Sequence, residues 1–262
     1  MKSISRITFA PWLRVGLLTL VMLILAGCVT TSTSSPQQVD LDKAEKTHVQ
    51  AGLAYLRQDD RESARRHFEK ALELNKRSAG AYNGLAYLYW SEQNLERAES
   101  FFRKALSLQP DFSRASNNYG SFLYSQMRYE EAEKYFKKVT EDYRYDSRHL
   151  ALLNLGRTEL KLGKTDAALA SFRQAIGINR RVAAPYLELA ELYFDAKNYP
   201  LARQHFDQYS QLAGQTSRSL WLGIRLEQIY GDKDKKASYA LALKNLYPDS
   251  AEYLEYVKSA NE

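Results

Sequence analysis

Apolar and small side chains recur along this chain in columns that keep a fixed spacing. One column is alanine (Ala64, Ala98, Ala132, Ala168, Ala202), one is phenylalanine (Phe68, Phe102, Phe136, Phe172, Phe206), and one is small (Gly52, Ala86, Gly120, Gly156, Ala190). Successive members lie 34 residues apart, except for a spacing of 36 between the third and the fourth. Columns that keep step in this way indicate an internal repeat whose stacked copies bury one continuous core.

Each cycle predicts two helices that form an antiparallel hairpin. Small residues belong where two helices approach most closely, and the phenylalanine fills the space beside them. Short polar turns separate paired helices, as at residues 58–60 and 196–198. Pro110 closes a repeat because proline cannot continue a helix, whereas Pro185 and Pro200 stand at expected helix starts. The 34-residue period resembles the tetratricopeptide repeat, which predicts an all-α, right-handed α-α superhelix of about six hairpins.

The repeats are expected at residues 45–78, 79–112, 113–146, 149–182, 183–216 and 218–250, within a domain of residues 43–262. The sixth is the least regular. We align Trp221 with the first-helix aromatic position, and Ala237 and Leu241 with the second-helix alanine and phenylalanine. Residues 247–262 are expected to add a short helix that covers the open end, since terminal repeats are atypical.

The first 27 residues have the features of a secretory signal peptide. Lys2, Arg6 and Arg14 supply positive charge, and residues 15–26 form an apolar run that is too short to span a bilayer comfortably. Residues 25–28, Leu-Ala-Gly-Cys, resemble the bacterial lipobox, so Cys28 is expected to receive a diacylglycerol and the chain to be cut before it. The alternative is an uncleaved anchor helix with an incidental cysteine.

Residues 28–42 are predicted to form the lipidated cysteine and a flexible tether, because this stretch is rich in Ser, Thr and Gln. Val29 follows the cysteine. In lipoproteins of this kind an Asp there signals retention in the inner membrane. The resemblance therefore implies a protein anchored in the outer membrane and facing the periplasm.

Composition and charge exclude several classes of function. The net charge is +6, three of these charges lie in the first fourteen residues, and the remaining Lys and Arg alternate with Asp and Glu, unlike a clustered nucleic-acid footprint. Cys28 is the only cysteine, which excludes an intrachain disulfide and a cysteine metal site. No catalytic motif is present, and we attribute the four histidines to the repeat and to helix starts. We predict a non-enzymatic scaffold for proteins, with no cofactor, metal or small-molecule substrate.

The first helix of each hairpin lines the concave face of such a superhelix, where an extended or helical peptide can bind. By repeat position, the expected partner-binding residues are Val49, Leu53, Leu56, Asn83, Tyr87, Trp90, Asn117, Ser121 and Tyr124. The same face farther along the stack is expected to include Leu153, Arg157, Lys161, Leu187, Glu191 and Phe194. Aromatics would anchor side chains of the partner and asparagines would bond its backbone. Alternatively, some of these aromatics pack between neighbouring repeats.

Three stretches carry a likeness to a known family, and the third is the most telling because it is not a good generic repeat. They are SRASNNYGSFLYSQMRYEEAEKYF at 113–136, APYLELAELYFDAKNYPLARQHFDQY at 184–209, and SLWLGIRLEQIYGDKDKKASYALALKNLYPDSAEY at 219–253. Together with Cys28, they resemble the type IV pilus biogenesis and stability lipoproteins, the pilotins of the pilus secretin. The resemblance implies binding of secretin subunits and promotion of their outer-membrane localisation and multimerisation. The alternative is a periplasmic adaptor for peptidoglycan enzymes or for the machinery that assembles outer-membrane barrels.

Overall fold

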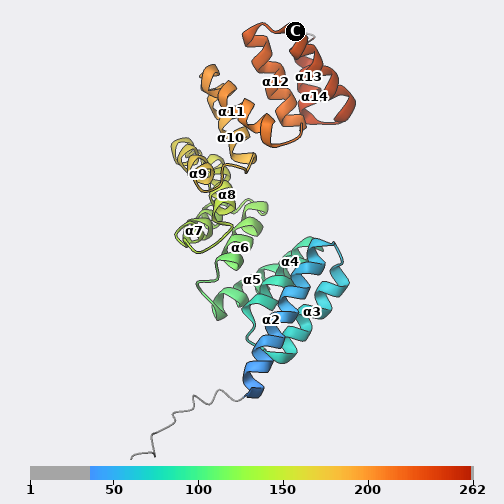
Figure 1. Cartoon of the computed structure of the whole chain (residues 1–262), viewed down its shortest axis with the longest axis vertical. Helices are drawn as coiled ribbons and strands as arrows, with labels where there is room; N and C mark the ends of the chain where they lie inside the picture. Colours follow the sequence, from blue (N-terminus) through green and yellow to red (C-terminus); the bar gives the residue numbers. More distant parts are fainter. Residues whose placement is uncertain (1–35, 261–262) are drawn as a thin grey trace, which may run out of the picture. The chain divides into compact units, whose positions relative to one another are not determined.

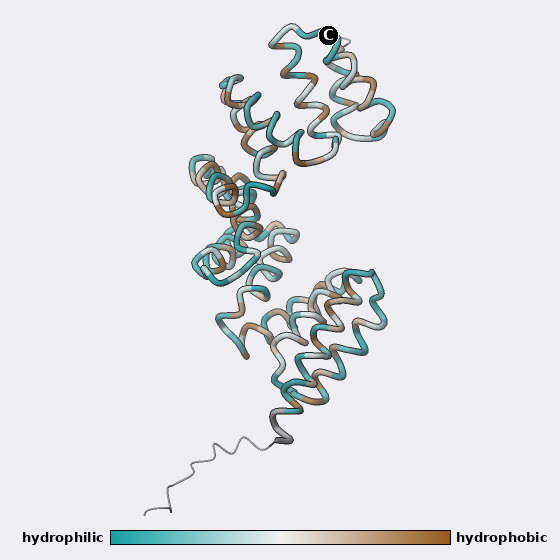
Figure 2. Tube along the Cα trace, viewed as in Figure 1, coloured by the Kyte–Doolittle hydropathy of each residue, from teal (hydrophilic) through white to brown (hydrophobic). Residues whose placement is uncertain are grey.

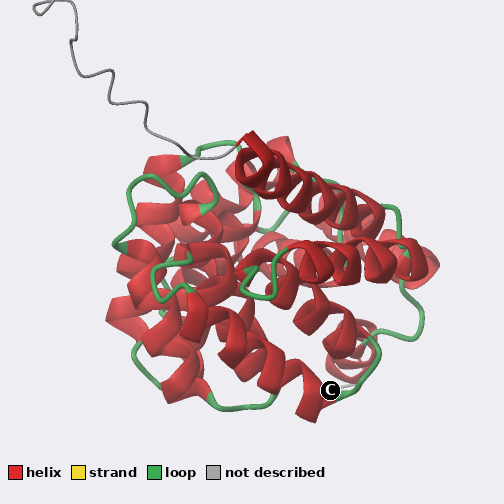
Figure 3. Ribbon diagram, turned by 90° about the horizontal axis from the view of Figure 1, so that it is seen from below, coloured by secondary structure: helices red, strands yellow, loops and turns green. Residues whose placement is uncertain are grey.

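The computed structural model describes residues 36–260, and every regular element within this range is an α-helix (Figures 1 and 3). The expected signal peptide at residues 1–27 and the expected lipid site Cys28 lie outside the described residues. Thirteen helices follow one another between residues 36 and 260, with no strand among them. The all-α prediction is confirmed. None of these helices is long and apolar enough to cross a membrane.

The helices alternate between first and second members of hairpins (Figure 1). The first members are α2 (Pro36–Arg57), α4 (Ala79–Ser91), α6 (Ser113–Ser125), α8 (Arg148–Lys161), α10 (Ala184–Asp195) and α12 (Ser217–Tyr230). The second members are α3 (Arg61–Leu74), α5 (Leu95–Leu108), α7 (Tyr129–Thr140), α9 (Thr165–Ile178), α11 (Tyr199–Leu212) and α13 (Lys233–Leu246). Helix α14 (Ala251–Ala260) follows the last hairpin and packs against α12 and α13.

Residues 36–42 correct one boundary of the predicted organisation. We expect the flexible tether to extend to residue 42, but α2 begins at Pro36. Proline is favoured in the first turn of a helix, where its missing N–H has no intrahelical partner to lose. No glycine or further proline follows through residue 42, so nothing interrupts the helix. The chain divides after Lys43, and the hairpin stack belongs to the unit Ala44–Glu262.

The phenylalanine column forms the centre of the hairpin cores. Phe68, Phe102, Phe136, Phe172 and Phe206 are at most 3% exposed. The small column lets the rings reach the first helix, because a β-carbon on Gly52 would lie 2.5 Å from Cε1 of Phe68, and one on Gly156 equally close to Cε1 of Phe172. The core is therefore a series of clusters along the stack, and Figure 2 shows apolar positions distributed over all the hairpins.

The turn inside each hairpin contains one residue with a left-handed backbone. These residues are Asp59, Gln93, Met127, Gly163, Lys197 and Gly231, with φ between 57° and 81°. Such a residue ends the first helix and reverses the chain direction. Four of the six are not glycine, although the left-handed region costs other residues about 1–2 kcal/mol. Packing of the two helices thus determines the left-handed conformation of the turn more strongly than the intrinsic backbone preference of the residue that adopts it.

The sixth hairpin uses other residues than the sequence alignment predicts. Ala237 is exposed and Leu241 is 60% exposed, so neither belongs to the core columns. Tyr239 fills the phenylalanine position, since a β-carbon on Gly223 would lie 2.9 Å from its Cδ2 atom. The predicted place of Leu241 in the phenylalanine column is wrong because the last repeat is shorter. Tyr239 stands 33 residues after Phe206, whereas Leu241 stands 35 residues after it.

Trp221 belongs to the terminal cap of the stack. It is half-buried and meets Tyr256 of α14 edge-on, with ring centroids 6.3 Å apart. Tyr253 and Tyr256 of α14 pack on the cluster that contains Leu220 and Leu243. Helix α14 therefore covers the last hairpin through tyrosines on one face.

The linker between α7 and α8 explains the single spacing of 36. Residues 141–147 join these helices, whereas residues 75–78 and 109–112 suffice between earlier hairpins. Asp142 in the longer linker accepts a hydrogen bond from Ser113 Oγ at 2.5 Å. The extra residues are thus tied to the start of α6, and the helix stack continues beyond them without a break in the phenylalanine column.

Candidate partner-binding surface

The first helices of the hairpins line two hollows. The N-terminal hollow is formed by α2, α4 and α6, measures about 280 Å³, and is lined by Leu53, Leu56, Arg57, Asn83, Gly84, Tyr87 and Asn118. The C-terminal hollow is formed by α6, α8, α10 and α12, measures about 370 Å³, and is lined by Tyr124, Arg157, Leu160, Lys161, Glu188, Glu191, Leu192, Asp195 and Arg218. Both therefore lie on the helices that a repeat scaffold uses for its groove.

Gly84 joins the lining of the N-terminal hollow to the core beneath it. A β-carbon at this position would lie 2.3 Å from Cζ of Phe68, so only glycine allows the ring to pack against the backbone of α4. Leu53 and Leu56 form the apolar wall on α2, and Tyr87 is 41% exposed on α4. An exposed tyrosine beside two leucines offers a partner both apolar contact area and a hydroxyl group.

Amide side chains border this hollow. Asn83 is 1% exposed, and its Oδ1 accepts a hydrogen bond of 3.1 Å from Nδ2 of Asn118. Asn117 carries a buried Oδ1 that has no hydrogen-bond partner. In the next repeat, Asn154 Nδ2 lies 3.5 Å from Ser121 Oγ. The amides that line the hollow, Asn83 and Asn118, therefore bond each other, and the unpaired amide oxygen of Asn117 lies outside the lining.

The C-terminal hollow contains an ion-pair network. Arg157 Nε donates to Glu188 Oε1 at 2.8 Å, and Arg218 Nη2 donates to Glu188 Oε2 at 3.1 Å. Arg218 also pairs with Glu191. Burial raises the pKa of Glu188, but the hydrogen bonds and charges of Arg218 and Arg157 outweigh it, so its pKa lies below the ordinary value. For Glu191 burial dominates over Arg218 and raises the pKa.

The structure divides the predicted groove residues among different surroundings. Leu53, Leu56, Asn83 and Tyr87 meet in the N-terminal hollow, whereas Tyr124 lines the C-terminal one. Val49, Trp90, Asn117 and Ser121 are half-buried and line neither hollow. Their part in binding stays a prediction.

Trp90 shows why aromatics at groove positions need not face a partner. Its ring meets Phe122 of the next hairpin edge-on at 6.0 Å and Tyr87 at 5.8 Å. It therefore packs between neighbouring hairpins and supports Tyr87. Leu153 and Leu187, which we expect on the same face, are only 5% and 6% exposed and belong to a core cluster instead, because this repeat position packs against the next hairpin.

Comparisons with known proteins place the chain in a family. Models of the tetratricopeptide repeat match residues 49–111, 111–181 and 153–215. The type IV pilus assembly protein PilF of Pseudomonas aeruginosa is 39% identical over 93% of this chain and 97% of its own length. The chain is a tetratricopeptide-repeat protein of the PilF family.

Solved structures of related proteins agree with this assignment. PilF of Pseudomonas aeruginosa superposes with a TM-score of 0.80 and 39% identity, covering 84% of this chain and 99% of that one. PilW, a widely conserved type IV pilus biogenesis factor, superposes with a TM-score of 0.70 and 26% identity, covering 81% of this chain and 98% of that one. The hairpin superhelix of this chain is thus shared with PilF and with PilW.

Sequence reasoning misses two of the residues that shape the N-terminal hollow in this PilF-family protein. Gly84 and Asn118 are absent from the predicted groove positions, yet both line it. A signal for them exists, because Gly84, Asn118, Asn154 and Glu188 form a column with the repeat spacings of 34, 36 and 34. That column runs beside the column of Leu53 and would have been found by following each first-helix position in turn.

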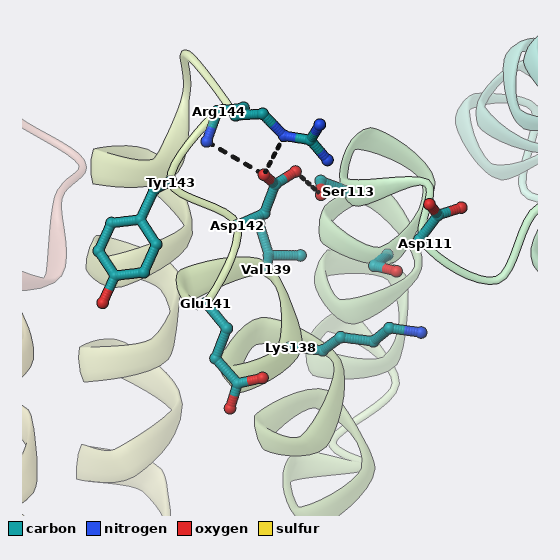
Figure 4. A pocket seen from close by; sticks show the side chains of 9 residues that line it. Asp111, Ser113, Lys138, Val139, Glu141, Asp142, Tyr143 and Arg144 are labelled. Atoms are coloured by element: carbon teal, nitrogen blue, oxygen red, sulfur yellow. Dashed lines mark hydrogen bonds and ion pairs between the residues drawn. The ribbon is translucent and has the colours of Figure 1, made fainter.

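A third hollow of about 420 Å³ lies between α6, α7 and the long linker of residues 141–147 (Figure 4). Figure 4 shows Asp142 pointing towards Ser113 and Arg144, while Tyr143 lies apart from them on the linker. Tyr143 is 82% exposed and Arg148 stacks over its ring at 4.2 Å. Asp142 and Arg144 contact each other, Lys138 donates to the carbonyl oxygen of Pro110, and no residue of this hollow belongs to the predicted groove.

Two histidines of this PilF-family protein that the sequence separates come together in the structure. Nδ1 of His48 lies 3.0 Å from Nδ1 of His67, and Tyr55 stacks on the His67 ring with centroids 5.2 Å apart. One imidazole donates and the other accepts, so the pair joins α2 to α3. Within the described residues, no three His, Cys, Asp or Glu side chains are grouped closely enough to hold a metal ion.

Proposed function

We propose that this protein is an outer-membrane lipoprotein that binds secretin subunits and promotes their outer-membrane localisation and multimerisation during type IV pilus assembly. The observation that carries the proposal is the relationship to PilF, a type IV pilus assembly protein, at 39% identity over 93% of the chain. The likeness to PilW, a type IV pilus biogenesis factor, supports the same process.

The N-terminal hollow supports the binding half of the proposal. It combines two leucines, an exposed tyrosine and amide groups, with Arg57 as the charged residue of its lining. Interfaces gain most of their affinity from a few aromatic anchors in desolvated pockets. A secretin subunit that inserts an apolar side chain beside Tyr87 would gain such an anchor, and the scaffold would hold it until assembly.

The anchoring half rests on the lipobox around Cys28. A lipid chain contributes about 0.8 kcal/mol per buried methylene, and two or more chains give stable anchoring. A subunit held by the hairpin stack would then travel to the membrane that the lipid occupies. The scaffold supplies recognition and the lipid supplies the destination.

A deletion strain complemented with variants tests both halves. Deletion should leave secretin subunits monomeric in the membrane fraction and remove pili. The full-length wild-type chain should restore both. Cys28→Ser should leave the protein off the outer membrane and reduce secretin multimers, because the thiol is the lipid acceptor. Normal secretin multimers in the deletion strain would overturn the proposal.

Crosslinking in cells tests the surface. A photoreactive amino acid at position 87 should capture the secretin subunit, since Tyr87 is 41% exposed beside the hollow. The same probe at position 143 is the matched control, because Tyr143 is a more exposed tyrosine on another surface. Capture of peptidoglycan enzymes or barrel-assembly proteins from position 87, without secretin, would contradict the assignment.

A further inference from the structure

The first hairpin holds two imidazole rings whose Nδ1 atoms face each other. His48 on α2 and His67 on α3 place these atoms 3.0 Å apart. Both residues are half-buried, so the pair lies at the surface of the hairpin. Tyr55 stacks on the His67 ring, with centroids 5.2 Å apart and planes inclined by 21°, and this contact holds the ring in its orientation. The geometry thus presents two nitrogen ligands from separate helices to one point.

The fifth hairpin contains the same arrangement with one ring exchanged. The residues that stand 138 positions after His48, Tyr55 and His67 are Tyr186, Tyr193 and His205. His205 stacks on Tyr193 with centroids 5.4 Å apart and planes inclined by 6°, and the Tyr186 ring lies 6.2 Å away. A histidine stacked on a tyrosine is therefore common to both hairpins and serves packing. Of the two, the first hairpin alone adds a second imidazole, which that packing does not require.

The distance between the two nitrogens suits a bidentate metal chelate. Imidazole nitrogen binds zinc at about 2.0–2.1 Å, and bonds of that length to nitrogens 3.0 Å apart enclose an angle of about 95° at the metal. A tetrahedral ion would need nitrogens about 3.3 Å apart, whereas a tetragonal ion has neighbouring ligands at about 90°. Tetragonal coordination by nitrogen is typical of Cu²⁺, which also binds a given site most tightly among the divalent first-row ions. The pair therefore fits Cu²⁺ best.

Binding of a cation leaves both imidazoles neutral. In the free protein one ring donates its Nδ1–H to the Nδ1 lone pair of the other. When a cation takes both lone pairs, the donor ring loses its Nδ1 proton to solvent and takes one up at Nε2. Two nitrogen–metal bonds form and one hydrogen bond is lost. Among the described residues no third His, Cys, Asp or Glu joins the pair, so water fills the remaining coordination positions.

We propose that His48 and His67 form a binding site for a divalent transition-metal cation, with Cu²⁺ as the ion that fits best. The bound ion joins α2 to α3 in the hairpin that carries Leu53 and Leu56 of the N-terminal hollow. A ligand that binds only the folded state stabilises that state, so the ion stabilises this hairpin. The site departs from our sequence-based expectation of no metal. It does not depend on secretin binding, so its test is separate from that of the proposed function.

Calorimetric titration of the untagged full-length protein with CuCl₂ provides the first test. The wild-type chain should bind a single ion. His48→Tyr, which rebuilds the arrangement of the fifth hairpin, and His67→Ala should each weaken binding by at least about tenfold, since even changes beyond the ligands themselves have effects of that size. The double variant should bind no more weakly than either single one, because a chelate is lost when either ligand is removed. Additive losses, or equal affinity in the wild type and His48→Tyr, would overturn the proposal.

His205→Ala is the matched control, because it removes a histidine from the repeat position of His67. It should leave the affinity for Cu²⁺ unchanged, and a loss as large as that of His67→Ala would overturn the proposal. His48→Gln, whose side chain is smaller than tyrosine, is a second variant with the same expected loss as His48→Tyr.

Thermal unfolding and spectroscopy separate a metal site from a structural contact. One equivalent of CuCl₂ should raise the unfolding midpoint of the wild-type chain and of His205→Ala, and EDTA should reverse the rise. The midpoint of His48→Tyr should not respond to the ion. Electron paramagnetic resonance of the Cu²⁺ complex should show hyperfine coupling to two nitrogen nuclei. Coupling to a single nitrogen, or a rise in midpoint that persists in His48→Tyr, would overturn the proposal.

Discussion

The two hollows on the first helices occupy equivalent repeat positions but differ in chemistry. Tyr87 in the N-terminal hollow and Glu191 in the C-terminal hollow belong to one column, as do Gly84 and Glu188. The first hollow is apolar with amides at its border. The second contains charged groups, and Glu188 at its base is 5% exposed between Arg157 and Arg218. One backbone scaffold thus supports two surfaces whose difference lies in the side chains.

The two hollows also differ in whether their polar groups already have partners within the protein. In the C-terminal hollow, Arg218 donates hydrogen bonds to Glu188 and Glu191. The network therefore joins α10 to α12, and few of the Arg218 donors remain for a ligand. In the N-terminal hollow, Tyr87 is exposed, and no ion pair occupies the lining side chains of Leu53, Leu56 and Tyr87. We expect the C-terminal hollow to matter mainly for stability and the N-terminal hollow mainly for binding.

The largest expected effect on stability comes from replacing one buried phenylalanine in each half of the stack by alanine. Phe68→Ala and Phe172→Ala should each cost about 3–5 kcal/mol of unfolding free energy, because each removes a fully buried ring and leaves a cavity. Partner binding should fail only for Phe68→Ala, whose ring lies under Gly84. Denaturant unfolding and partner affinity check the pair. Equal loss of binding in both variants would contradict the separation of the halves.

Removing the charge of Glu188 should destabilise the C-terminal half with little effect on binding. Glu188→Gln keeps the shape but weakens three charge-assisted hydrogen bonds, at a cost of about 2 kcal/mol. The pKa of Glu188 lies below its ordinary value of 4.5, so its stabilisation is complete above that pH and is lost as the pH falls through the folded-state pKa. Unfolding free energies should therefore differ at pH 7 and converge in more acidic solution. A constant difference across this range would exclude the ion-pair explanation.

Truncation of Tyr87 tests the binding half directly. Tyr87→Ala should weaken partner affinity by about tenfold or more, since an aromatic anchor at an interface contributes on the order of 1.5–3 kcal/mol. Lys161→Ala in the C-terminal hollow should change affinity less than about twofold. Calorimetry on the full-length protein measures both, and Tyr87→Phe indicates how much the hydroxyl contributes. A larger effect at Lys161 would reverse our assignment of the two hollows.

Sequence reasoning predicts the fold well and the binding surface only in part. Repeat columns identify Phe68 and its equivalents because burial at a close helix contact tolerates few residue types. Groove positions are less constrained. Asn83, Leu153 and Leu187 share one repeat column that we predict to face the groove, yet each is at most 6% exposed, so periodicity locates a column without showing whether it faces solvent or the next hairpin. The position of Tyr239 was missed because the last spacing contracts to 33 residues, and a fixed period cannot anticipate where a terminal hairpin shifts.

The smallest effects concern the turns, which are the feature that both halves share. Met127 and Gly163 hold the same left-handed position, with φ of 59° and 72°. Met127→Gly should stabilise the protein by about 0.5 kcal/mol, because relief of the left-handed strain exceeds the entropy that glycine adds to the unfolded chain. Gly163→Ala should destabilise it by about 0.5–1 kcal/mol through strain alone, since a β-carbon at Gly163 would meet no atom within 4 Å. Denaturant unfolding should show effects of opposite sign for the two variants, and partner affinity should be unchanged in both. This result would mean that the two hollows differ through their side chains and share one turn geometry. A change in affinity in either variant would mean that the backbone itself distinguishes the two halves.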